Sequence, residues 1–170
     1  MPDLNFNVSL SGKIDLSDVE KMLKKCKVTI KVGYPSGRPH IDTIHIRQKD
    51  GSYKTASETG DEISELAKEL YYGSSRTPAR PFLTDAIEKN KDRIYGALKE
   101  EAKKVINGGQ ANWDMIGALA VGCIQEFVRG DYYKTNIPNS EEWQKIKGSD
   151  MPLIDGGDLI NATTYIVEGK

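Results

Sequence analysis

Alternating apolar and polar residues predict strands in separate parts of the chain. Val28–Gly33 is rich in β-branched residues with a period of two, and Ala162–Val167 alternates again near the C-terminus. Between them, Ile41–Gln48 and Ser52–Ala56 flank Lys49-Asp50-Gly51. An Asp-Gly pair supplies the positive φ that a tight hairpin turn requires. These patterns predict a small, mostly antiparallel sheet.

Longer stretches have the period of a helix instead. The first is predicted to begin at Thr59, whose hydroxyl caps the helix with Glu62 as its capping-box partner, and to stop at Gly73. The second reaches from Thr84 to about Val105. With the helix described next, the patterns predict two or three helices packed against the sheet.

The third predicted helix, Asn112–Arg129, carries apolar residues at almost every fourth position. So broad a stripe indicates a helix that is buried around much of its circumference. Gly117 and Gly122 have no side chains and would let another backbone approach closely. That neighbour is either the chain's own sheet or a second subunit.

The N-terminal residues 1–27 are predicted to form an arm beside the main core. A weak pattern with a period of two covers Asn5–Leu10, and Asp15 or Ser17 can cap a short helix that runs to Lys25. The remaining core, residues 28–168, belongs to a single domain over residues 1–170. A chain of this length buries roughly two-thirds of its unfolded surface.

Asp131–Asp150 shows no periodicity and is predicted to be a long loop before the last strand. Its aromatic residues, Tyr132, Tyr133 and Trp143, argue against disorder because aromatic side chains need a surface to bury against. We therefore expect this loop to contact a partner. Together the patterns predict an α+β fold.

The composition is that of an ordinary globular domain. The chain has 38% hydrophobic residues, 29% charged residues and a net charge of −1, so no basic field favours nucleic-acid binding. We expect neither a secretory signal nor a membrane span. Cys26 and Cys123 have no disulfide or zinc spacing, and the apolar pattern around Cys123 indicates a buried thiol.

Candidates for catalytic or metal-binding chemistry are few. His40, Asp42 and His45 lie close together in the sequence. Residues five apart in a strand face opposite sides, which disfavours a metal ion shared by the two histidines. The sequence has no phosphate-binding, dinucleotide-binding or serine-nucleophile motif. A metal-dependent hydrolase or nuclease that uses these three residues is a remote alternative, and no cofactor is expected.

The segment that follows Gly73 has an unusual local pattern. It forms an extended strap that contains Pro78 and Pro81, which restrict the backbone before folding. Phe82-Leu83 then plug the start of the next helix. Because Arg80 lies between the prolines, its guanidinium is expected to project in a fixed position that suits capture of a carboxylate.

A second unusual segment, Pro152–Leu159, leads into the last strand. Asp155 can cap a short turn that begins at Gly156 and Gly157, and Leu159 is expected to be buried. By itself this pattern predicts only a capped turn.

In this order, the two segments resemble the tail-completion or neck proteins of long-tailed bacteriophages. That family includes Mu-type virion morphogenesis proteins and relatives of the lambda-type minor tail protein Z. The resemblance covers roughly residues 28–168. The first motif is matched by Gly73, Pro78, Ala79, Arg80, Pro81, Phe82 and Leu83. The second is matched by Pro152, Leu153, Asp155, Gly157, Leu159, Tyr165 and Val167. The chain departs from the family pattern at Ser74, Gly156 and Ala162-Thr163.

The resemblance implies a non-enzymatic structural protein of the virion, made in the host bacterial cytoplasm and placed at the head–tail junction or the top of the tail. It implies a homo-oligomeric ring that matches the sixfold symmetry of the tail. The ring would contact connector or adaptor proteins and a tail terminator or tail-tube protein. DNA would pass through the lumen without sequence-specific binding, and no membrane is involved. A tail terminator or tail-tube protein is the alternative, and the charge balance disfavours a DNA-binding module.

Overall fold

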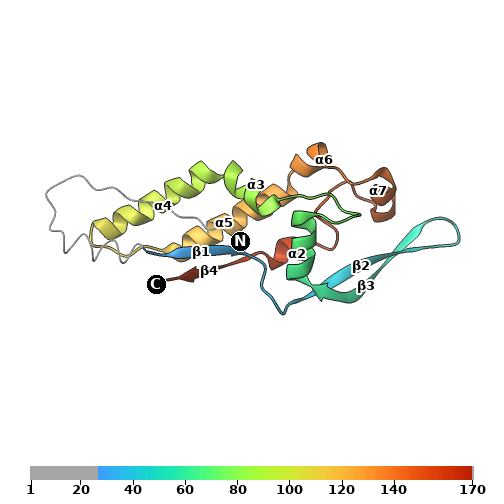
Figure 1. The fold of residues 1–170 in the computed structure, drawn as a ribbon, viewed down its shortest axis with the longest axis horizontal. Helices are drawn as coiled ribbons and strands as arrows, with labels where there is room; N and C mark the ends of the chain where they lie inside the picture. The colour runs from blue at the N-terminus through green and yellow to red at the C-terminus, as the bar shows by residue number, and fades with distance from the viewer. Residues whose placement is uncertain (1–26, 170) are drawn as a thin grey trace.

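The computed structural model describes residues 27–169, except for the side chains of residues 40–44 and 57. Within these residues, seven helices and two antiparallel two-stranded sheets build an elongated α+β fold (Figure 1). The predicted fold class is confirmed. In chain order the elements are β1 (Thr29–Gly33), β2 (Pro39–Arg47), β3 (Tyr53–Glu62), α2 (Ile63–Tyr72), α3 (Phe82–Lys89), α4 (Lys91–Ile106), α5 (Trp113–Arg129), α6 (Tyr132–Asn136), α7 (Glu141–Lys147), α8 (Asp158–Ala162) and β4 (Thr164–Glu168).

The core lies between α5 and the sheet formed by β1 and β4. Thr29 pairs with Glu168 and Gly33 with Thr164, so the first and last described strands lie antiparallel. A Cβ atom on Gly117 would overlap the ring of Tyr165. The neighbour that this glycine admits is therefore the chain's own sheet. Among the described residues, nothing lies within 4 Å of a Cβ atom placed on Gly122, so a close approach by a second subunit at this position stays a prediction.

The predicted start of α5 is confirmed. Asn112 caps the helix, because its side-chain oxygen accepts a hydrogen bond from the backbone N–H of Met115 at 3.2 Å. The helix ends at Arg129, as its apolar pattern predicts. Cys123 is buried on this helix, and desolvation raises the pKa of its thiol.

The predicted single helix from Thr84 to Val105 is two helices, α3 and α4, which meet at Asn90. The side-chain amide of Asn90 donates to the carbonyl of Ala86 at 2.9 Å. Its backbone ψ of 13° departs from that of a regular helix. An asparagine side chain that competes for a backbone carbonyl explains the break, which the apolar spacing alone does not reveal.

The predicted hairpin is confirmed, but its second strand runs further than expected. Thr59 pairs with Ile41 inside the ladder, so it does not cap a helix. The helix begins at Ile63, whose backbone N–H donates to the carbonyl of Arg38 at 3.0 Å, and Glu62 precedes it without a side-chain cap. Strand pairing has overridden the capping signal.

The predicted long loop at Asp131–Asp150 contains two short helices, α6 and α7. Ser140 caps α7 by accepting a hydrogen bond from the backbone N–H of Trp143 at 3.2 Å, and Gly148 ends the helix with a φ of 69°. Helices this short do not complete enough turns to show a period in the sequence.

The N-terminal arm, with the strand predicted at Asn5–Leu10 and the helix predicted to run to Lys25, lies outside the described residues. Within residues 27–169, no helix has the length and apolar character needed to span a membrane. The last strand begins at Thr164, two positions later than predicted, because Asp158–Ala162 forms α8.

Candidate interaction groove

The strap folds back over the end of α2. Gly73 ends the helix with a φ of 80°, and a Cβ atom there would lie 2.7 Å from the backbone nitrogen of Ala79. The backbone N–H of Arg80 donates to the carbonyl of Leu70 at 3.0 Å, and the backbone N–H of Ser74 donates to the carbonyl of Thr77 at 2.8 Å. The chain reversal therefore requires glycine at position 73, as predicted.

Arg80 is buried, with only 2% of its surface exposed. Its Nε donates to the carbonyl of Ile137 at 3.0 Å, and its Nη2 donates to the carbonyl of Pro138 at 3.3 Å and to Oδ1 of Asn139 at 3.1 Å. The prediction of a projecting guanidinium that captures a carboxylate is wrong. Desolvation lowers the pKa of Arg80, but a guanidinium stays protonated in proteins.

Phe82 confirms its predicted place as a plug, because its side chain is fully buried. Its ring makes edge-to-face contacts with Tyr34 and Tyr71, each with 6.1 Å between ring centroids. Pro81 occupies the N-cap position of α3, and Leu83 packs half-buried against the core. Pro78 is exposed at the outside of the strap. Arg80 and Phe82 are thus architectural.

The aromatic residues expected to meet a partner divide into two kinds. Tyr133 is buried against Phe127, and its hydroxyl donates to Oδ2 of Asp85 at 2.5 Å, so the surface that this aromatic side chain buries against belongs to its own chain. Burial raises the pKa of Tyr133, and the hydrogen bond from the hydroxyl to Asp85 adds to the rise. Tyr132 and Trp143 remain exposed.

The second motif lines a groove of about 240 Å³ between α2, α7 and the segment before α8. Helix α2 supplies an apolar wall, α7 supplies Trp143, and the motif supplies the floor. The lining residues are Leu66, Leu70, Trp143, Lys147, Pro152, Leu153, Asp155, Gly156, Gly157, Asp158 and Leu159. The structure therefore brings Trp143, predicted from another segment, together with the motif residues.

The sequence predicted that Asp155 caps the turn before α8, and this prediction is wrong. Helix α8 begins after Gly157, which has a φ of 86°, and no side chain caps it. Leu159 is buried as predicted. The carboxylate of Asp155 instead lies at the rim of the groove, where its Oδ2 is 3.4 Å from Nε2 of His45.

His45 holds the hairpin against the edge of this groove. Its side chain is 4% exposed and lies between the carboxylate of Asp155 and the ring of Trp143, 5.7 Å away between centroids. His45 therefore connects the hairpin both to the rim of the groove, through Asp155, and to α7, through Trp143. His45 enters the site through packing. The remote alternative of a metal-dependent enzyme that uses His40, Asp42 and His45 is untested, because the side chains of His40 and Asp42 are not described.

Arg80 links the two motifs. The carbonyl groups it holds, at Ile137 and Pro138, directly precede Ser140, the cap of the helix that carries Trp143. The buried guanidinium of the first motif therefore positions the aromatic wall of the groove that the second motif lines. The sequence indicated this relation only through the resemblance.

Sequence reasoning missed some groove residues. Leu66 and Leu70 share one face of α2, and their i, i+4 spacing was the available signal. Lys147 is half-buried, and its ammonium donates to the carbonyl of Met151 at 2.5 Å. Desolvation lowers the pKa of Lys147.

The chemistry available in the groove is that of a binding surface, with apolar walls, backbone groups and carboxylates at its rim. Among the side chains that the structure describes, no group of three His, Cys, Asp or Glu residues is arranged to hold a metal ion. No protein-family model, curated protein or solved structure matches this chain.

Proposed function

We propose that this chain is a structural virion protein of a tailed bacteriophage, a tail-completion or neck protein that forms part of a ring at the head–tail interface. It would be needed for tail assembly or head–tail joining and would let DNA pass through the lumen of the ring. Its partners would be copies of itself, the connector or adaptor proteins, and a tail terminator or tail-tube protein. The proposal assigns it no catalytic step.

One observation carries this proposal: the second of the two segments that resemble the family lines a groove, and Arg80 of the first segment holds the backbone ahead of the helix that supplies the aromatic wall of that groove. The groove combines an exposed aromatic residue, Trp143, with apolar residues of α2 and carboxylates at its rim. Protein interfaces commonly combine an aromatic anchor, an apolar centre and a polar rim. Docking of a partner therefore suits the groove better than turnover of a small substrate.

The net charge of −1 fits passage of DNA through a ring without tight binding. A protein that grips duplex DNA neutralises several phosphates with clustered lysine and arginine residues. A nearly neutral chain provides no such overall field. The ring would act by its shape and its contacts with neighbouring proteins.

Mass measurement tests the proposal. We expect the full chain, mixed with connector and tail-terminator proteins from the same genome, to enter a complex that holds several copies. Trp143→Ala should weaken that complex, since the aromatic wall is lost. Tyr95→Ala is the matched control, because Tyr95 is 45% exposed on α4 and Trp143 is 42% exposed. A chain that stays monomeric with these partners would count against the proposed function.

A further inference from the structure

We propose that the groove binds the tip of the β2–β3 hairpin from a second copy of this chain. The inference rests on the proposed function in taking the partner to be another copy. The shape and charge of the two surfaces are independent of the phage assignment.

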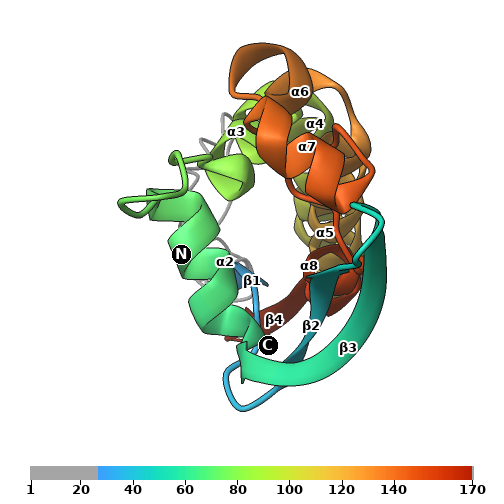
Figure 2. The ribbon, with the colours of Figure 1, turned by 90° about the vertical axis from the view of Figure 1, so that its right-hand side faces the viewer.

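The hairpin projects from the body as an arm. Its strands pair from Pro39–Glu62 at the base to Arg47–Tyr53 near the tip. At about 3.3 Å per residue, nine residues of β2 extend roughly 30 Å. Figure 1 shows the outer part of the hairpin continuing beyond α7, and Figure 2 shows α2 and α7 on opposite sides of the view.

The turn at the tip is structured. Oδ1 of Asp50 accepts hydrogen bonds from the backbone N–H of Ser52 at 3.0 Å and from its hydroxyl at 2.6 Å. Gln48 and Gly51 close the turn through a backbone hydrogen bond of 3.1 Å. A pre-formed tip loses less conformational entropy on docking than a flexible loop would.

One face of the arm is turned away from its own body. His45, Arg47 and Tyr53 line a cleft between the hairpin and α7. Because side chains alternate along a strand, Ile46 and its cross-strand partner Lys54 lie on the opposite face. Ile46 is 47% exposed, so this face presents an apolar side chain next to an ammonium group.

The charges of the tip and of the acceptor surface are complementary. On the outward face of the tip, Lys54 lies beside Ile46, and Lys49 lies in the turn, where the acid Asp50 is hydrogen-bonded to Ser52. The groove offers apolar residues for Ile46, with Asp155 at its rim. Opposite charges around an apolar contact fix orientation and speed association.

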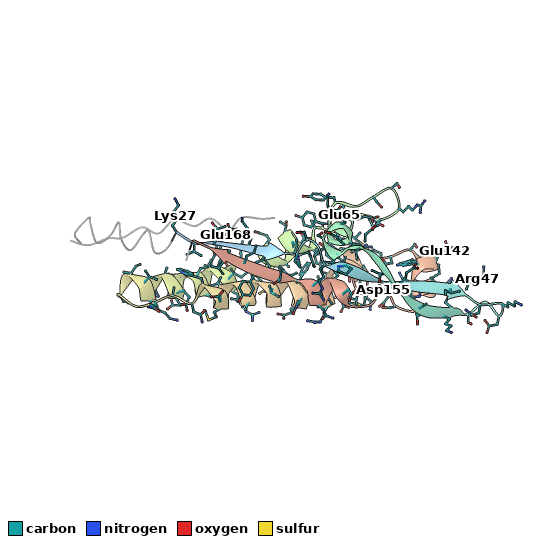
Figure 3. The ribbon with its side chains drawn as sticks, turned by 90° about the horizontal axis from the view of Figure 1, so that it is seen from below. Lys27, Arg47, Glu65, Glu142, Asp155 and Glu168 are labelled. Carbon is teal, nitrogen blue, oxygen red and sulfur yellow. The ribbon has the colours of Figure 1, made fainter. Side chains whose placement is uncertain are left out.

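The acidic surface continues across α2. A neighbouring hollow, which shares Leu66 with the groove, is lined by Asp61, Glu65 and Glu69, with Glu65 paired to Lys68 at 3.3 Å. Figure 3 shows Arg47 far out on the hairpin and Glu65 on the body. The basic and acidic surfaces are therefore separate parts of the chain.

The hairpin cannot serve its own groove. His45 is held against Asp155 at the rim, and the residues beyond it run along α7, where Arg47 and Tyr53 line a cleft with that helix, and then past its end. The tip therefore reaches this groove only on another copy. A contact between two different surfaces is heterologous and repeats from copy to copy, which builds a ring where the rotation closes.

Photocrosslinking of the full chain tests the inference. A benzoylphenylalanine placed at position 46, in place of Ile46, should give a covalent dimer on irradiation. Peptide mapping should place the crosslink in α2 or in the segment from Trp143 to Leu159. The same group at position 95, in place of the exposed Tyr95, is the matched control and should give no dimer.

Charge reversal supplies a second readout. Lys49→Glu with Lys54→Glu should lower the dimer yield about tenfold, which corresponds to about 1.4 kcal/mol. Glu65→Lys with Glu69→Lys should do the same. Mixing the two reversed chains should restore the dimer, because each then meets the opposite charge. Circular dichroism of each variant checks that its fold is retained.

The outcomes separate the inference from the proposed function. Exclusively monomeric product, crosslinks outside the groove, or reversed chains that fail to rescue one another while folded would overturn the inference. Crosslinks from position 46 to a different neck protein in assembled particles would overturn it and leave the phage assignment intact. A mapped dimer from a chain that phage particles do not need would uphold the inference and refute the proposed function.

Discussion

Arg80 shows how a single buried cation can organise two distant segments. In the part of the chain that the structure describes, its guanidinium donates to the carbonyl groups of Ile137 and Pro138 and to the side chain of Asn139, with no ion pair to a carboxylate. A planar group with several N–H donors suits such a set of oxygens, which the single ammonium of lysine could not reach in the same geometry.

We predict that Arg80→Met lowers the free energy of unfolding by about 2–4 kcal/mol, because several buried acceptors lose their donor. Urea denaturation followed by circular dichroism measures the change. Arg76→Met is the control in the same strap, since Arg76 is exposed and should cost little. Equal denaturation midpoints for the two variants would contradict the role of Arg80.

Tyr34 gives the fold a dependence on alkaline pH. Burial raises the pKa of its phenol from 10.0 to about 12, although the hydrogen bond from the Thr163 hydroxyl opposes this rise. The unfolded chain therefore loses this proton at lower pH than the folded chain does. The stability linked to Tyr34 is fully present below pH 10 and is lost as the pH rises towards 12.

Tyr34→Phe should weaken this loss of stability between pH 10 and 12. The slope should change by up to about 1.4 kcal/mol per pH unit. Denaturation at a series of pH values measures the slope. Tyr133, whose pKa is also raised, contributes a loss of stability of the same sign in the wild-type chain and in the Tyr34→Phe variant. Unchanged slopes would show that the phenol of Tyr34 is not linked to folding in this way.

Helix α5 packs against the sheet formed by β1 and β4, and the glycines at positions 117 and 122 of this helix contribute differently to that packing. Gly117 lies against the ring of Tyr165 in β4, where any larger side chain would force the sheet away. Within residues 27–169, nothing lies within 4 Å of where the Cβ atom of an alanine at position 122 would be. Among the described residues, the same residue type in one helix therefore serves packing at position 117 and does not at position 122.

We expect Gly117→Ala to cost about 1–3 kcal/mol through overpacking. Gly122→Ala should stabilise the chain by about 0.5–1 kcal/mol, because alanine favours a helix over glycine. Thermal unfolding of the two variants provides the comparison. If both substitutions stabilise, the close contact between α5 and β4 is not as described.

The elements that the sequence predicted best are those with a long repeat or a decisive residue. The stripe of α5, the cap at Asn112 and the stop at Gly73 were all visible in the sequence. The errors arose where hydrogen bonds that apolar spacing does not encode decided the outcome. Thr59 had the pattern of a helix cap but is paired across the hairpin, and Asn90 breaks a helix whose apolar spacing continues.

The groove could be predicted only in part, for the same reason. Leu159 and the glycines before it were identified from their local pattern. The proximity of Trp143 to them depends on Arg80, which holds the backbone ahead of α7. The contact between His45 and Asp155 joins residues 110 positions apart, and no local pattern encodes it.

At the scale of the molecule, a nearly neutral net charge conceals an uneven distribution. Bases gather near the tip of the projecting hairpin, and acids gather on α2 and at the rim of the groove. An elongated chain with an arm at one end and a groove on the body presents two different surfaces through which copies could associate repeatedly. This arrangement supports a part in a larger assembly, whose partners the groove and the arm would select.

The most direct test of this account is electron microscopy of particles made after the coding sequence is deleted from the genome that carries it. The account predicts incomplete tails, or filled heads and tails that fail to join. Wild-type protein supplied in the same cells should restore joined particles, and Trp143→Ala should restore far fewer. Normal joined and infectious particles in the absence of the protein would contradict the central claim.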